Sequence, residues 1–140
     1  MKLKISELTI ESYERVFDLW NRCDGIGLGD SDTKENIALF LKRNPGMSCI
    51  AKMGDTLVGA VLAGHDGRRG YIYHLAVSAN HRQQGIGRML VAHCIGRLKT
   101  AGISKCHIFM FTDNAAGKKF WDAAGWSCRN DIGMLSRFID

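Results

Sequence analysis

Residues 70–87 read GYIYHLAVSANHRQQGIG, and this stretch decides the fold. Its first half is an apolar run that predicts a strand over 71–77, and the run ends at the polar residues 78–81. A basic segment with two glycines follows, and residues 86–100 have the apolar spacing of a helix that ends at Gly102. A strand that leads through such a loop into a helix leaves main-chain N–H groups unpaired at the positive end of the helix dipole. The pattern therefore predicts an anion site, and phosphate is the anion that fits it best.

Upstream of this stretch, apolar patterns predict four elements. They are a short edge strand at 3–5, an amphipathic helix over 11–23, a second helix from about Thr33 to 44–46, and a hairpin of 47–53 with 56–64. Gly54-Asp55 supplies the turn of that hairpin. The N-terminal half is therefore expected to begin the sheet with antiparallel strands.

Downstream, the sequence predicts a strand over 105–111, a helix from Asn114 through Ala124, and a last hairpin within 127–139. An antiparallel start followed by one strand–helix–strand unit indicates a mixed α/β sheet with helices on its faces. With 140 residues, the chain is expected to be one domain, 1–140.

Composition places the chain among ordinary globular proteins, with 46% hydrophobic and 24% charged residues. No apolar run approaches the roughly 20 residues of a membrane-spanning helix, and no secretory signal pattern is present, so we expect a cytoplasmic protein without a membrane partner. The five cysteines are widely spaced. They are expected to be reduced thiols, most of them buried, and not ligands of a metal.

A net charge of +5, from 19 basic and 14 acidic side chains, suits an anionic ligand. A solvated surface with a modest basic excess explains the same charge equally well. A nucleic-acid partner is not expected, because basic residues are not interleaved with aromatic ones and no recognition helix is apparent.

Two common nucleotide-binding loops do not match the glycine segment. A dinucleotide loop needs a third glycine, where this chain has Leu90. A Walker loop ends in Gly-Lys-Ser or Gly-Lys-Thr, where this chain has Gly87, Arg88 and Met89.

A different pair of motifs fits. The first is Arg82-x-x-Gly85-x-Gly87, preceded by Leu75-Ala76-Val77, and the second is the run 114–126, NAAGKKFWDAAGW. Together they resemble the motifs of the GNAT family of acetyl-CoA-dependent N-acetyltransferases, and the element order matches over nearly the whole chain. The resemblance implies a GNAT-like fold: a mostly antiparallel, twisted sheet, splayed at the cofactor site. It also implies an acyltransferase that carries acetyl from acetyl-CoA to a primary amine of a small molecule or peptide, by direct attack in a ternary complex and without a metal.

The resemblance also implies roles for particular residues. Main-chain N–H groups in the glycine loop would hold the pyrophosphate of coenzyme A; these residues are Arg82, Gln83, Gln84, Gly85, Ile86, Gly87 and Arg88. The strand residues Leu75, Ala76 and Val77 would pair with the pantetheine amides, and an N–H among them would polarise the acetyl carbonyl. Asn114 would hydrogen-bond the pantetheine arm, a role compatible with capping its helix. Lys118, Lys119 and Arg88 either approach the 3′-phosphate or are solvated charges.

The usual catalytic positions of the family are not filled by the usual residues. The tyrosine that protonates the departing sulfur is replaced by Trp121, and the two carboxylate positions hold Phe109 and Tyr71. These departures favour a second hypothesis, an acyl-CoA-binding sensor or regulatory module with little or no turnover.

Strand alternation places Tyr71 and Tyr73 on one face with Leu75 and Val77, and His74 on the other. Tyr73 is accordingly the leading catalytic candidate, to orient the substrate or pass a proton. His74 has a suitable side chain, although packing explains it as well.

Other arrangements stay open. Asp24 and Asp30 flank a glycine-containing loop, where either could bind a cationic substrate or cap a helix. A protein acid or base is dispensable if positioning and the oxyanion contact supply the rate. The acceptor amine is not specified by the sequence. A homodimer is compatible with the resemblance, because dimers are common in the family.

Overall fold

Residues 2–140 are described by a computed structural model, in which the chain divides into two units after Phe109. The first unit contains the sheet and the second, Met110–Asp140, contains one helix and the C-terminal tail. None of the helices in the described range has both the length and the apolar character needed to cross a membrane.

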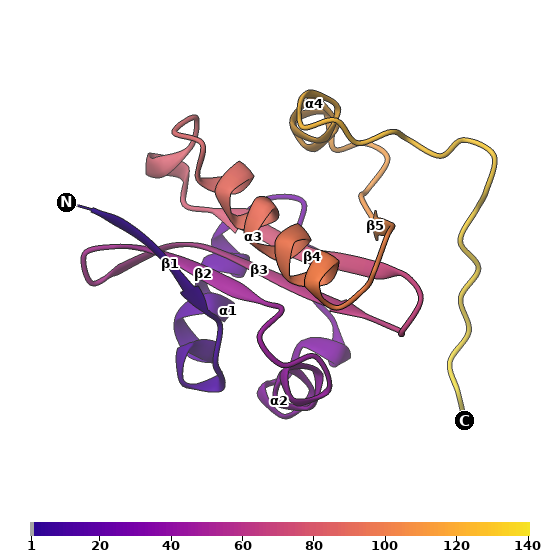
Figure 1. The fold of residues 1–140 in the computed structure, drawn as a ribbon, viewed down its shortest axis with the longest axis horizontal. Coiled ribbons are helices and arrows are strands. Elements are labelled where there is room, and N and C mark those ends of the chain that lie inside the picture. Colours follow the sequence, from indigo (N-terminus) through magenta and orange to yellow (C-terminus); the bar gives the residue numbers. More distant parts are fainter. Residues whose placement is uncertain (1) are drawn as a thin grey trace. The chain divides into compact units, whose positions relative to one another are not determined.

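The sheet of the first unit has five strands in the order in which they occur along the chain (Figure 1). They are β1 (Leu3–Glu7), β2 (Cys49–Met53), β3 (Thr56–His65), β4 (Gly70–Val77) and β5 (Cys106–Ile108). Neighbours are antiparallel as far as β4, whereas β5 is parallel to β4. The expected edge strand, hairpin and mixed sheet are confirmed. β5 is shorter than the expected strand over 105–111, because its pairing with β4 covers three residues.

Two layers of helices cover the sheet, with α1 and α2 on one face and α3 on the other (Figure 1). The helical elements of this unit are η1 (Ile10–Ser12), α1 (Tyr13–Arg22), η2 (Asp30–Asp32), α2 (Lys34–Arg43), η3 (Ala79–His81) and α3 (Ile86–Thr100). Thr33 caps α2 by accepting a hydrogen bond from the Asn36 N–H at 3.2 Å. The helices expected from the apolar spacing are therefore present, and α3 has the expected bounds.

The core under α1 and α2 is built around Trp20, with Leu19 and Val16 from the same helix and Ile37 from α2. On the other face, α3 lies close to the sheet because glycine occupies the contact points. A Cβ at Gly59 would lie 2.9 Å from Cδ1 of Leu90.

The second unit contains α4 (Ala115–Ala123), whose N-terminus is capped by Asn114 and which is followed by Gly125 at φ +91°. The expected hairpin within 127–139 is wrong: these residues form no regular secondary structure in this unit. The apolar residues of the tail do not keep a period of two, since Met134 and Leu135 are adjacent, and an isolated hairpin is marginal in water.

The five cysteines are free thiols, but fewer of them are buried than expected. Cys49 and Cys94 are buried, Cys23 and Cys106 are half-buried, and Cys128 is exposed.

Gly59→Val tests the close approach of α3. The added methyl groups would meet the buried Leu90 side chain, so we expect the free energy of unfolding to fall by about 1–3 kcal/mol. Gly96→Ala in α3 is the control, because its Cβ meets no atom within 4 Å among the described residues, and we expect a gain of about 0.5–1 kcal/mol. Urea unfolding measures both changes, and equal stability of the two variants would contradict the packing described here.

Candidate functional site

The sheet opens after the third residue of β4. Gly70, Tyr71 and Ile72 pair with β5, whereas residues 73–77 have no neighbouring strand on that side within the described chain. This stretch includes Leu75, Ala76 and Val77, the residues expected to pair with pantetheine. The structure thus leaves their outer edge open to an extended ligand, as the sequence-based hypothesis requires.

The glycine loop connects this open edge to α3. Gln83 at φ +62° and Gly85 at φ +81° have left-handed backbone conformations, which alternate with right-handed ones in N–H-lined anion sites. The first hydrogen bond of α3 runs from the Met89 N–H to the Gly85 carbonyl at 3.0 Å. The N–H groups of Ile86 and Gly87 therefore project from the helix end, where they have no partner among residues 2–140.

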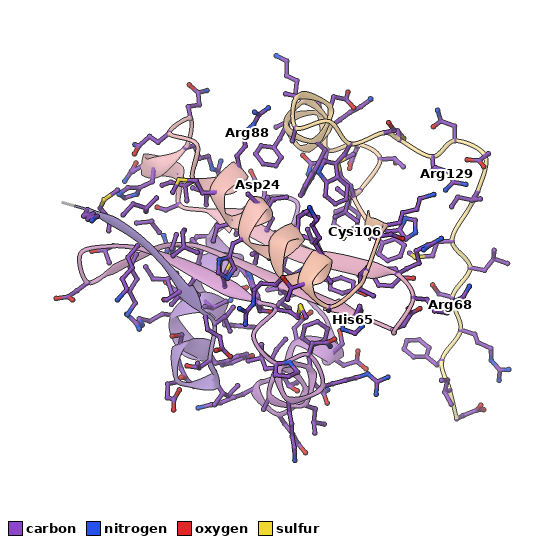
Figure 2. The ribbon with its side chains drawn as sticks, in the orientation of Figure 1. Asp24, His65, Arg68, Arg88, Cys106 and Arg129 are labelled. Atoms are coloured by element: carbon purple, nitrogen blue, oxygen red, sulfur yellow. The ribbon has the colours of Figure 1, made fainter. Side chains whose placement is uncertain are left out.

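Two arginine side chains, those of Arg82 and Arg88, extend from the loop and from the first turn of α3. The Arg82 guanidinium reaches back to the end of β4, where Nε donates to the Val77 carbonyl at 3.0 Å. Arg88 extends from the first turn of α3, the end of the helix that carries the loop (Figure 2). The helix dipole and these cations give this end of the first unit a positive potential, which suits a diphosphate.

A β-bulge in β4 overturns the expected alternation of its side chains. Ala60 pairs with Ala76, but two residues along β3 Leu62 pairs with Tyr73, so β4 contains one extra residue. His74 lies within this bulge and has φ +54°, a left-handed backbone conformation.

The bulge changes which residues share a face. Tyr73 contacts Phe40 of α2, with ring centroids 6.0 Å apart, so it faces the α1–α2 layer. Val77 pairs with Gly59, which faces α3. Leu75, two residues away from Val77, lies on that same face. The prediction that Tyr71 and Tyr73 share a face with Leu75 and Val77 is therefore wrong.

His74 was expected on the opposite face from Tyr73, but it also lies toward α1. The Trp20 indole packs edge-on against the His74 ring, with centroids 4.9 Å apart, and Trp20 Nε1 donates to the His74 carbonyl at 3.1 Å. Nε2 of His74 lies 2.8 Å from Oδ1 of Asp32. Sequence reasoning missed Asp32, because the two residues are 42 positions apart and no local pattern relates them.

Asp32 is 4% exposed, and its carboxylate is held from two sides. Oδ2 accepts a hydrogen bond from the Gly29 N–H at 2.9 Å, while Oδ1 contacts His74. The Tyr13 hydroxyl donates to the Asp32 main-chain carbonyl at 2.6 Å. In contrast, Asp24 and Asp30, the acidic candidates from the sequence, are exposed, and Figure 2 labels Asp24 in the loop after α1.

Three stacked rings lie side by side, two of them on β4 and one directly after β5. Tyr71, Tyr73 and Phe109 form this aromatic cluster, with centroid distances of 6.2 Å between the tyrosines and 6.1 and 6.5 Å from each to Phe109. Tyr71 and Phe109 are the two positions at which the family resemblance implies a carboxylate. Burial, and secondarily the neighbouring Tyr71, raises the pKa of Tyr73 above its usual value. Its hydroxyl therefore stays protonated at neutral pH and can donate, but not readily accept, a proton.

In the second unit, Asn114 Oδ1 accepts a hydrogen bond from the Gly117 N–H at 2.9 Å, so this side chain caps α4. Trp121 packs edge-on against Phe120 and Trp126, at 5.0 Å from each. Lys118 forms a surface ion pair with Asp122 at 2.9 Å. The capping role of Asn114 is confirmed, and its contact with pantetheine stays a prediction.

Comparison with known proteins agrees with this geometry. A profile described as the acetyltransferase (GNAT) family matches residues 13–126. An acetyltransferase of Pectobacterium atrosepticum is 32% identical over 130 residues, which cover 93% of this chain and 92% of that protein. The PaiA N-acetyltransferase of Thermoplasma acidophilum, solved in complex with coenzyme A, has a similar fold, with a TM-score of 0.80 at 19% identity, covering 95% of this chain and 94% of that one. AAC(6′)-Iy, solved with a bisubstrate analogue, has a TM-score of 0.77 at 15% identity, covering 99% and 100% of the two chains.

The loop can be tested with inorganic pyrophosphate. At ten times its Kd, pyrophosphate should stabilise the protein by about 1.4 kcal/mol, measured as a rise in Tm. Gly85→Asp should abolish this stabilisation, because it places a negative charge in the anion site. Gly85→Asn is the matched control, since asparagine is nearly the same size and also tolerates a left-handed backbone. Equal responses of the two variants would show that the anion binds elsewhere.

Proposed function

The chain belongs to the GNAT family of acetyltransferases, and we propose that it transfers acetyl from acetyl-CoA to a primary amine of a small molecule or peptide. The observation that carries the proposal is the open edge of β4 leading directly into the N–H-lined loop of α3. An extended thioester with a diphosphate at its far end matches this pairing of an unpaired strand edge with an anion site.

This geometry and the family resemblance support the following assignment of the cofactor residues. We assign the pyrophosphate to the main-chain N–H groups of residues 82–88 and the pantetheine arm to residues 75–77, with Asn114 as a further hydrogen-bonding partner of the arm. An N–H of β4 at the bulge would donate to the thioester carbonyl. Such a donor stabilises the oxyanion that forms when the amine attacks, and each such contact contributes roughly 3–4 kcal/mol to lowering the barrier.

The amine must lose a proton before it attacks. A lysine-like amine with a pKa of about 10.4 is mostly protonated at pH 7, and reaching its neutral form costs about 4.6 kcal/mol. Tyr73, with its raised pKa, is a donor that could orient the acceptor or protonate the departing sulfur. Tyr71 and Phe109 are aromatic and supply no carboxylate.

The acceptor is proposed at the level of a primary amine. Proteins with a similar fold include an aminoglycoside acetyltransferase solved with sisomicin and a ribosomal-protein-alanine N-acetyltransferase, each at 18% identity. These similarities concern the fold and leave both small-molecule and peptide amines as candidates. The aromatic cluster favours an acceptor whose apolar or planar part can lie against rings.

We also propose a cytoplasmic location, which the five free cysteines favour because thiols persist in reducing compartments. A homodimer is proposed from the family resemblance alone. Light scattering coupled to size-exclusion chromatography would test it, and a mass of 15.5 kDa in solution would contradict it.

The alternative function is an acyl-CoA sensor with little or no turnover. Trp121 favours it, because an indole packed between two rings supplies no acid where the family carries a tyrosine.

Calorimetry followed by a thiol-release assay separates the two functions. We expect acetyl-CoA and coenzyme A to bind and ATP not to bind. We then expect thiol release in the presence of at least one amine from a panel containing spermidine, sisomicin and an alanine-initiated peptide. Binding without thiol release would support the sensor, and no binding of acetyl-CoA at millimolar concentration would exclude both functions.

Trp121→Tyr tests whether a missing acid limits turnover. If sulfur protonation limits the rate, kcat should rise, most clearly at high pH, where solvent protons are scarce. Trp121→Phe is the control, because it makes the same change in ring size without adding a hydroxyl. Equal rates for both variants would show that Trp121 acts only in packing.

A further inference from the structure

We propose that His74 is the residue that accepts the proton of the attacking amine, and that Asp32 positions it for this role. This inference rests on the proposed acetyl transfer and adds a base where the usual carboxylate positions hold Tyr71 and Phe109. The inference starts from the contact between the His74 and Asp32 side chains, on the side of β4 that faces α1 and α2.

The contact with Asp32 determines which ring nitrogen is free. A carboxylate oxygen 2.8 Å from Nε2 accepts a hydrogen bond there, so the neutral imidazole carries its proton on Nε2. Nδ1 then has a lone pair, and it has no hydrogen-bond partner within residues 2–140. Among these residues the single fully buried, unpaired side-chain nitrogen or oxygen belongs to His81, so Nδ1 of His74 is not sealed off from solvent. The His74 side chain is 17% exposed, which leaves Nδ1 free to accept a proton.

The position of His74 along the chain places this base next to the proposed reaction. Leu75 follows it directly, and the main chain of 75–77 is the edge assigned to the pantetheine arm and the acetyl group. The bulge directs the His74 side chain toward α1, away from the α3 face of the sheet. A left-handed backbone at a histidine is strained, and such strain persists where the surroundings hold it in place.

The surroundings hold the imidazole rigidly. The Trp20 ring covers one side, its Nε1 holds the His74 carbonyl, and Asp32 holds Nε2. The ionisable groups on the elements packed around this pair include Tyr13 of α1, which donates to the Asp32 carbonyl, Tyr73, which precedes His74 on β4, and Cys23 after α1, whose thiol contacts the Val77 carbonyl. Asp32 is the carboxylate in contact with the ring, and it stabilises the imidazolium that forms when the proton arrives.

Nδ1 of His74 takes one proton from the ammonium form of the acceptor, and the freed electron pair of nitrogen attacks the carbonyl carbon of acetyl-CoA. The new C–N bond forms, the C–S bond breaks, and sulfur leaves as the thiolate of coenzyme A. The nitrogen then loses a second proton, which ends on sulfur, and His74 returns its own proton to solvent.

The test compares His74→Asn with the wild type. Asparagine tolerates the left-handed backbone, but its amide cannot accept the proton. With the most active amine of the panel, we expect kcat/KM to fall about 10²–10⁴-fold, while the Kd for acetyl-CoA changes less than about two-fold. The rise of kcat/KM with pH that the wild type owes to its base should disappear in this variant, because a base must be unprotonated to act.

Asp32→Asn tests the positioning role, with Asp18→Asn on the exposed side of α1 as the matched control. The Asp32 variant should lower kcat/KM by at least about ten-fold, and the control should leave it unchanged. Long-range ¹⁵N NMR of the imidazole should show the Nε2–H tautomer in the wild type and its loss in Asp32→Asn. This readout responds to the contact itself, so it remains informative if the Asp32 variant is less stable.

The outcomes separate this inference from the function on which it rests. A wild-type pH profile retained in His74→Asn, or a proton found on Nδ1 of His74, would overturn the inference and leave acetyl transfer intact. A wild type that binds no acetyl-CoA, or releases no thiol with any amine, would overturn the proposed transfer and the inference together.

Discussion

One extra residue in β4 determines how this protein presents its candidate site. The bulge lies between the Leu62–Tyr73 and Ala60–Ala76 pairs, and it reverses the facing of every residue that follows. Because of it, Tyr73 and His74 both face the α1–α2 layer, while Leu75 and Val77 face α3. Without the bulge, the imidazole would lie on the α3 side, among the apolar contacts that hold that helix to the sheet.

The bulge lies just beyond the point where the pairing of β4 with β5 ends. β5 pairs with β4 over three residues. The bulged half of β4 therefore has no neighbouring strand on that edge among the described residues, and it leads into the glycine loop. An open strand edge usually invites aggregation, and covering it with a ligand is one way to satisfy its main-chain groups. In the proposed function, the same short segment would supply hydrogen-bonding groups for an extended cofactor, a positive loop for its phosphates, and a base on the α1–α2 face.

With the role proposed for His74 and Asp32, one chemical requirement would be met by different residues. Tyr71 and Phe109, at the positions where the family resemblance implies carboxylates, stack on each other at 6.1 Å. The buried carboxylate of the first unit is instead Asp32, on η2, and it reaches β4 through His74. Burying a carboxylate is costly unless it is hydrogen-bonded, and here Gly29 and His74 both bond it. The cost of its burial supports a role that a neutral side chain could not perform.

The sequence by itself determined the order of elements from β1 to α4, the bounds of α3, the capping of α4 and the glycine loop, because each depends on residues within one or two turns of one another. It also predicted the family through two local motifs. It did not determine the facing of β4, the end of β5 or the absence of a tail hairpin, and it did not indicate Asp32. Those features depend on pairing between strands and on contacts across as many as 54 positions. Only the tertiary structure decides them, since strand register and a distant side-chain contact have no signature in the spacing of neighbouring residues.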